Sequence, residues 1–304
     1  MQTLTTKDIL KKVRRIEIRT NRLVSDVLAG SYHSVFKGRG INFDEVREYI
    51  SGDDVRTIDW NVTARTGAPH IKKFSEEREL TIILMIDISA SGNFGSQNTT
   101  KRELMAELGS ILAFSAVKNN DKVGLLLFTD SVELYIPPAK GRTHILRVIR
   151  EILYFKPKGT LTDFALPLDF ISKVTRRRAI IFLLSDYAFS NPQEAVLQGL
   201  QPKLKICNKH HDLISIMVSD PREFELPDLG WITLEDTETG NMVEVNSGDP
   251  LVREQYKRLN LTRKDSLKKT LNSAGIDFLD LSTDHPYVPE LLSFFGTRKR
   301  RYAR

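Results

Sequence analysis

Short runs of apolar residues alternate with longer amphipathic segments over most of the chain. The run at 80–86, Leu-Thr-Ile-Ile-Leu-Met-Ile, is typical of a strand buried on both faces. The pattern predicts strands at 80–86, 123–128, 132–136, 179–184, 213–218 and 276–281. It predicts helices at 100–119, 143–155, 163–175, 192–207, 251–274 and 287–296. This alternation indicates an α/β fold, with a mostly parallel sheet and helices on both faces.

One region of the α/β part breaks the alternation. Residues 231–234 and 242–245 predict a β-hairpin, inserted at the rim of the sheet within about 221–249. We therefore divide the chain into an N-terminal region, 1–79, and an α/β domain, 80–304, that carries the inserted hairpin.

The N-terminal region is predicted to hold a basic amphipathic helix at 6–29, followed by short strands and turns. Between 38 and 78, acidic residues and arginines alternate around two aromatic residues. We expect this segment to pack on the sheet, with Trp60 buried and with its charged neighbours paired: Arg47, Arg56, Asp59 and Arg65. The alternative is that Arg47, Arg56 and Arg65 form a recognition face for a partner protein.

Composition places the chain among soluble globular proteins. It has 304 residues, of which 40% are hydrophobic and 28% charged. No apolar run approaches the roughly 20 residues that a membrane-spanning helix needs. The N-terminal residues lack the apolar core of a secretory signal, and Cys207 is the single cysteine. We therefore expect a cytoplasmic protein without an integral membrane segment.

The net charge of +6 is concentrated in part at the C-terminus. Residues 297–304 contain five basic side chains: Arg298, Lys299, Arg300, Arg301 and Arg304. Such a tail is compatible with binding to nucleic acid, but no aromatic and basic groove accompanies it. We favour a frayed, solvated terminus and consider nucleic acid an unlikely partner.

Oxygen-bearing side chains follow the first predicted strand of the α/β domain. Asp87, Ser89 and Ser91 form the pattern Asp-x-Ser-x-Ser at its carboxyl end, where open α/β sheets bind ligands. Taken alone, this pattern is more typical of a turn. Two further loops, however, carry similar groups: Gly-Thr-Leu-Thr-Asp at 159–163, and Asp186 after the strand at 179–184. Carboxylate and hydroxyl oxygens suit Mg²⁺ or Mn²⁺.

The three loops resemble the metal-ion-dependent adhesion site of the von Willebrand factor type A fold. The resemblance implies that one divalent ion is held by Asp87, Ser89, Ser91, Thr160 and Asp186. Thr162 is the alternative to Thr160 and is also a candidate for contact with a partner. Gly92 stands where that family usually has Met after the second serine, which implies a looser loop.

Longer motifs resemble a bacterial family known as domain of unknown function 58. They include Gly-Arg-Gly-x-x-Phe-Asp-Glu-Val-Arg-Glu-Tyr from Gly38, Phe-x-Glu-Glu-Arg-Glu-Leu from Phe74, and Asp-Pro-Arg-Glu from Asp220. The resemblance covers nearly the whole chain. It implies an adaptor that acts with a MoxR-type AAA+ ATPase, or with its client protein, in chaperone-like maturation of complexes.

We favour a non-enzymatic, metal-assisted interaction protein over two alternatives. The first alternative is a divalent-metal-dependent hydrolase that uses Asp87 and Asp186. The Asp-x-Asp of haloacid dehalogenase-type phosphatases is absent, since position 89 is serine. The phosphate-binding loop of ATPases is absent too. The second alternative is a nucleic-acid-binding module that uses the basic ends of the chain.

Overall fold

The computed structural model describes residues 42–75, 79–97, 99–189 and 193–302. The helix predicted at 6–29 lies outside these residues. In the described part of the chain, no helix is both long enough and apolar enough to span a membrane.

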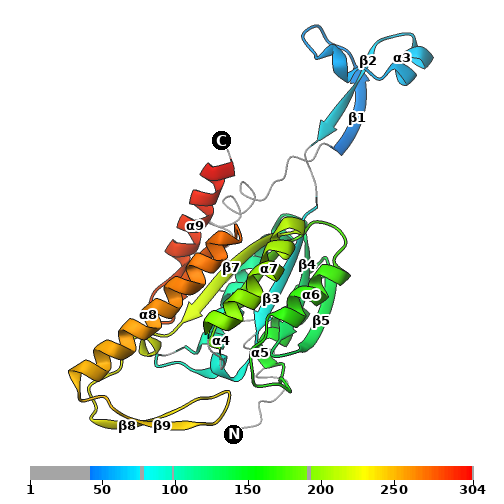
Figure 1. Cartoon of the computed structure of the whole chain (residues 1–304). Coiled ribbons are helices and arrows are strands. Elements are labelled where there is room, and N and C mark those ends of the chain that lie inside the picture. The colour runs from blue at the N-terminus through cyan, green and yellow to red at the C-terminus, as the bar shows by residue number, and fades with distance from the viewer. Residues whose placement is uncertain (1–41, 76–78, 98, 190–192, 303–304) are drawn as a thin grey trace.

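A six-stranded sheet forms the centre of the α/β domain (Figure 1). Neighbouring strands follow the order β10 (Asp277–Ser282), β7 (Asp212–Ser219), β6 (Ile180–Ser185), β3 (Thr81–Asp87), β4 (Lys122–Phe128) and β5 (Val132–Ala139). All neighbours pair in parallel except β4 and the edge strand β5, which are antiparallel. The predicted fold class, with a mostly parallel sheet, is therefore confirmed.

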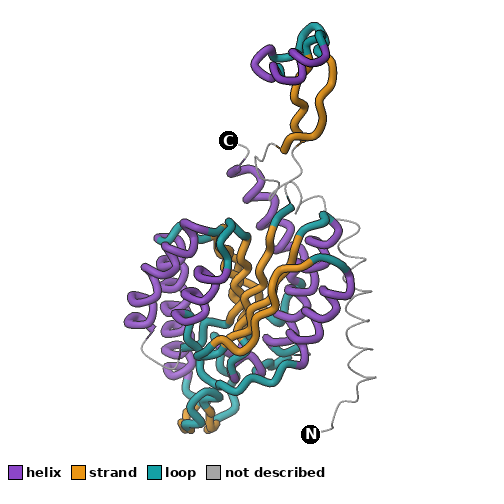
Figure 2. Tube along the Cα trace, turned by 90° about the vertical axis from the view of Figure 1, so that its right-hand side faces the viewer, coloured by secondary structure: helices purple, strands orange, loops and turns teal. Residues whose placement is uncertain are grey.

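Helices cover both faces of the sheet (Figure 2). One face packs against α4 (Lys101–Lys118), α5 (Arg142–Tyr154) and α9 (Tyr287–Tyr302). The other packs against α6 (Ala165–Val174), α7 (Gln193–His210) and α8 (Pro250–Ser273). Along β3, Ile82, Leu84 and Ile86 join the first core, and Ile83 and Met85 join the second. Burial on both faces explains why this strand is continuously apolar.

The predicted insertion is present between β7 and α8. A short 3-10 helix, η4 (Pro221–Glu223), follows β7. The antiparallel hairpin of β8 (Trp231–Glu235) and β9 (Met242–Asn246) comes next. The base of the hairpin is held by Ser247, whose amide and hydroxyl both donate to the carbonyl of Gly230, at 2.7 and 2.9 Å.

Residues 42–75 form a small unit that both views show apart from the six-stranded sheet (Figures 1 and 2). Its strands β1 (Asn42–Glu48) and β2 (His70–Ser75) pair with each other. Between them lie η2 (Val55–Thr57) and α3 (Trp60–Thr66).

The prediction that Trp60 is buried is wrong, because this side chain is 70% exposed. Trp60 begins α3, and β1 and β2 form a sheet of their own rather than an extension of the large one. Asp59, expected in an ion-pair lattice, caps α3 by accepting from the amides of Asn61 and Val62. Arg47 does form an ion pair, with two hydrogen bonds of 2.9 and 2.7 Å to Asp53.

Arg56 and Arg65 are exposed residues of η2 and α3. Their predicted role in binding a partner, together with that of Arg47, stays a prediction.

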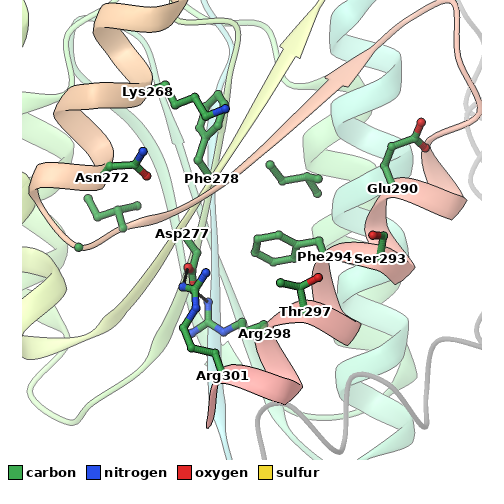
Figure 3. A pocket seen from close by; sticks show the side chains of 13 residues that line it. Lys268, Asn272, Asp277, Phe278, Glu290, Ser293, Phe294, Thr297, Arg298 and Arg301 are labelled. Carbon is green, nitrogen blue, oxygen red and sulfur yellow. Dashed lines mark hydrogen bonds and ion pairs between the residues drawn. The ribbon is translucent and has the colours of Figure 1, made fainter. Parts of the chain in front are cut away.

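The basic C-terminal segment is helical as far as Tyr302, so the expectation of a frayed tail is wrong for 297–302. The reason is Arg298, which is only 2% exposed. Its guanidinium pairs with Asp212 at the start of β7 and, at 3.0 Å, with Asp277 at the start of β10. Figure 3 shows Arg298 and Arg301 beside Asp277, at one end of a cavity of about 530 Å³ between α8, β10 and α9.

We expect Arg298→Met to lower the free energy of unfolding by about 3 kcal/mol, because it leaves two partly buried carboxylates without their shared cation. Urea denaturation followed by circular dichroism measures this loss. The matched control is Arg300→Met, since Arg300 lies on the exposed side of the same helix. A loss equal to that of the control would show that the buried ion pairs do not anchor α9.

Candidate metal centre

The first predicted site residue, Asp87, lies where the two central strands end. Ile86 of β3 pairs with Leu184 of β6, so Asp87 comes next to Ser185 at the carboxyl edge of the sheet. One carboxylate oxygen of Asp87 accepts from the Ser185 hydroxyl at 2.6 Å, and the other accepts from the Ser89 amide at 2.9 Å. Because Asp87 is only 1% exposed, these hydrogen bonds replace water around its charge.

The two serines of the Asp-x-Ser-x-Ser pattern are also buried. Their hydroxyl oxygens lie 3.1 Å apart, at the start of the 3-10 helix η3 (Ala90–Asn93). The loop at 159–163 reaches this point, because the Ala90 amide donates to the carbonyl of Thr160 at 3.1 Å.

Gly159 lets the second loop approach the end of β4. A Cβ atom at this position would lie 2.3 Å from a carboxylate oxygen of Asp130 and 2.4 Å from the hydroxyl of Thr129. The Gly159 amide also donates to Glu133 at 2.8 Å. Any larger residue would therefore force the side chains of Thr129 and Asp130, or the loop that carries Thr160 and Thr162, to move.

The two threonines of this loop are placed differently from the serines. Thr160 is an exposed residue, and it is tied to the serine loop by its carbonyl group. The Thr162 hydroxyl donates to Glu238 at 2.8 Å, at the turn of the inserted hairpin. The structure thus brings the threonine loop to the site, while the role of either hydroxyl as a metal ligand stays a prediction.

Asp186, the third predicted carboxylate, is 5% exposed and lies one residue beyond β6. One of its oxygens accepts from the Ala188 amide at 3.1 Å. The other is 2.6 Å from the amino nitrogen of Lys101, which also pairs with Glu223 of η4. Four buried groups therefore converge here, and we call Asp87, Ser89, Ser91 and Asp186 the oxygen cluster.

Asp220 fixes the loops around the oxygen cluster. It accepts from the amide and the hydroxyl of Ser96, at 2.9 and 2.6 Å, and from the hydroxyl of Thr283 at 2.7 Å. Burial raises the pKa of Asp220, but these hydrogen bonds outweigh it and the net pKa is lowered. One ionised side chain thus joins the loops that follow β3, β7 and β10.

Negative charge accumulates in the oxygen cluster. Burial, and next the charge of Asp186, raise the pKa of Asp87 to about 7, despite the hydrogen bonds from Ser185 and Ser89. Burial likewise raises the pKa of Glu223, although the charge of Lys101 opposes this effect. Asp186 and Glu223 share the ammonium of Lys101, and Asp87 lies near enough to feel the charge of Asp186, so an additional cation would be favoured electrostatically.

The oxygen cluster fits a hard divalent ion. Among the described residues, no group of three or more His, Cys, Asp and Glu side chains is arranged to hold a metal. Hydroxyl groups would therefore have to complete any site, and Ser89 and Ser91 are in place to do so. Asp87, Ser89 and Ser91 would hold Mg²⁺ or Mn²⁺, and Asp186 would supply further negative charge. Such an ion would add a Lewis-acidic position for an oxygen ligand.

A cleft of about 1040 Å³ opens beside the oxygen cluster. Ser91, Asp186 and Lys101 line one side of it, and Ile232 and Leu234 of β8 line another. Aromatic and basic side chains are also present in its wall: Phe94, Phe189, Phe224, Tyr256, Arg222, Arg263 and Lys264. Acidic side chains line the cleft as well: Asp186, Glu223, Glu235, Asp236 and Glu238. The wall is therefore partly apolar and of mixed charge, and the cleft can take a chain segment with both apolar and charged side chains.

Sequence reasoning missed Lys101, Ser185 and the structural role of Asp220 and Glu223. In the sequence, the motif Asp-Pro-Arg-Glu at 220–223 is only a family feature. In the structure its two acidic residues cap η4: the Asp220 side chain accepts from the Arg222 amide, and the Glu223 side chain accepts from the Asp220 amide. A signal for Lys101 did exist. This basic residue opens a helix after the cap Thr100, where an acidic residue is preferred.

Residues 45–266 match the family described as "Protein of unknown function DUF58". An uncharacterized protein of Mycobacterium tuberculosis is 31% identical over 290 residues, which are 95% of this chain and 89% of that protein. One of Mycobacterium avium is 27% identical over 167 residues, which are 54% of this chain and 94% of that protein.

Two solved structures show a partial likeness. The conserved hypothetical protein BatB from Bacteroides thetaiotaomicron matches 73% of this chain and 99% of its own, with 14% identity and a TM-score of 0.45. The SpRpn10 VWA domain matches 71% of this chain and 94% of its own, with 10% identity and a TM-score of 0.39. The family match and the mycobacterial relative over 30% identical are the decisive findings: this chain belongs to the DUF58 family.

Proposed function

We propose that this protein is a non-enzymatic interaction module that holds Mg²⁺ or Mn²⁺ in the oxygen cluster and uses the ion to bind another protein. The observation that carries the proposal is the burial of Asp87, Ser89, Ser91 and Asp186 together, with Ser91 and Asp186 lining a large cleft. Burying a carboxylate costs free energy unless its charge is paired. Buried carboxylates with a perturbed pKa at a ligand-binding edge of a sheet therefore favour a functional role.

The ion provides a contact that the protein's own side chains do not. Mg²⁺ usually keeps several waters when it is bound by one or two carboxylates. One of these waters can be replaced by a carboxylate of the partner, which would then lie at the entrance of the cleft. Residues that flank this carboxylate can contact the apolar inner face of the hairpin, formed by Ile232 and Leu234.

The resemblance to the DUF58 family suggests the partner. We propose a MoxR-type AAA+ ATPase or its client protein, and an adaptor role in the chaperone-like maturation of complexes in the cytoplasm. The threonine loop and the arginines of the small N-terminal unit are further candidates for contact with this partner, namely Thr162, Arg47, Arg56 and Arg65.

The metal bridge is tested with Asp87→Asn. Asparagine resembles the protonated acid and can still accept from the Ser89 amide, so folding should be preserved. The substitution removes the negative charge that residue 87 offers to the ion. We expect affinity for a purified MoxR-type ATPase to fall about tenfold in Mg²⁺, because a charged ligand of the ion is removed. We expect EDTA to weaken wild-type binding by a similar factor. Isothermal calorimetry measures both changes.

The control for this experiment is Asp169→Asn, which removes a carboxylate from a surface ion pair with Lys203 on α7. Equal affinity for wild type and Asp87→Asn, with and without EDTA, would rule out the metal bridge. Turnover of a phosphoester by the Mg²⁺-loaded protein would favour the hydrolase interpretation instead. Salt-sensitive binding to DNA or RNA would favour the nucleic-acid interpretation.

The role of the cleft is tested with Leu234→Ser in β8. Leu234 lines the cleft and belongs to a hairpin outside the main core, so the substitution should reduce partner affinity about tenfold with little loss of stability. Thr233→Ser is the control, because the neighbouring side chain points to the opposite face of the strand. Surface plasmon resonance gives the affinities, and thermal melting verifies the fold. If both variants bind like wild type, the partner does not enter this cleft.

A further inference from the structure

Lys101 is a buried cation in contact with the oxygen cluster. It is the first residue of α4, and its side chain is 1% exposed, as is that of Asp186. The amino nitrogen lies 2.6 Å from Asp186, pairs with Glu223 and is 5.8 Å from the centre of the Phe94 ring. The ammonium is therefore enclosed by protein rather than by water.

The surroundings of Lys101 would be unfavourable for a lysine without these partners. The amino end of a helix carries partial positive charge, which repels a cation. Burial lowers the pKa of Lys101, but the charges of Asp186 and Glu223 outweigh burial and the net pKa is raised. The ammonium contacts both carboxylates and cancels part of the negative charge that surrounds it.

Asp186 is fully engaged when Lys101 is bound to it. One carboxylate oxygen faces the ammonium, and the other accepts from the Ala188 amide. A divalent ion in the oxygen cluster would therefore meet a positive charge next to one of its acidic groups. Glu223 offers the ammonium a second partner, so Lys101 can release Asp186 without losing every contact with negative charge.

We infer that Lys101 is an internal competitor of the divalent ion: its ammonium neutralises Asp186 in the metal-free protein and lowers the affinity of the oxygen cluster for metal. This inference rests on the proposed metal site. It has two consequences of opposite direction. Without metal, the lysine stabilises the fold by pairing buried carboxylates. With metal, it opposes binding by repulsion between like charges.

The test compares Mn²⁺ binding by the full chain in wild type, Lys101→Met and Lys101→Arg. Methionine keeps much of the apolar length of the side chain and removes its charge, whereas arginine keeps the charge. We expect Lys101→Met to bind Mn²⁺ at least about tenfold more tightly than wild type, because a repelling charge is lost. Lys101→Arg should stay within about threefold of wild type. Electron paramagnetic resonance of free Mn²⁺ gives the affinities.

Thermal melting supplies a second readout. In EDTA, Lys101→Met should melt below wild type, and Mn²⁺ should raise its melting temperature more than that of wild type. Lys203→Met is the matched control, since it removes a lysine that is ion-paired on the surface, between α7 and α6. Lys101→Gln is the second neutral variant if methionine prevents folding, because its amide still donates a hydrogen bond to a carboxylate.

The outcomes separate this inference from the proposed function. Mn²⁺ binding that is equal or weaker in the neutral variants than in wild type overturns the competitor role and leaves the metal site standing. If only the neutral variants bind Mn²⁺, the competitor role is supported. The proposed function is then contradicted, because it requires the wild-type protein to bind the ion. Failure of every variant to bind Mn²⁺ overturns both.

Discussion

Parallel pairing between β3 and β6 is the interaction on which the candidate site depends. Its register places Asp87 beside Ser185 and the carboxylate of Asp186 just beyond. A shift of one residue would exchange the two faces of β3, each of which is fitted to its own core, and would move Asp87 away from the Ser185 hydroxyl. The apolar residues that precede Asp87 therefore determine where its buried charge lies.

Burial of this charge sets the chemistry of the edge. Two carboxylates, Asp186 and Glu223, share the ammonium of Lys101. The pKa of Asp87 is raised to about 7, first by burial and then by the charge of Asp186. Asp220 shows the contrasting solution, in which hydrogen bonds from Ser96 and Thr283 keep a buried carboxylate ionised. The same edge of the sheet thus contains Asp220, whose hydrogen bonds hold loops together, and the oxygen cluster, whose negative charge attracts a cation.

The local sequence pattern is sufficient to predict the strands and helices of the α/β domain, but not the contacts between residues that are far apart in the chain. The first strand of the α/β domain was predicted at 80–86 and lies at Thr81–Asp87, because uninterrupted apolar character is visible within a few residues. The carboxylates of the site followed from their positions at strand ends. The partner of Lys101, Glu223, is 122 residues away, and that of Arg298, Asp212, is 86 residues away. Such pairs, and the exposure of Trp60, depend on the assembled structure.

The inserted hairpin has a consequence for local unfolding. A two-stranded hairpin is marginally stable by itself in water. This one is fastened at its base by Ser247 and at its turn by the hydrogen bond from Thr162 to Glu238. Its amide protons should therefore exchange with solvent faster than those of the six-stranded sheet. Because Ile232 and Leu234 of the hairpin line the cleft, local unfolding of the hairpin would widen the cleft while the six-stranded sheet stays folded.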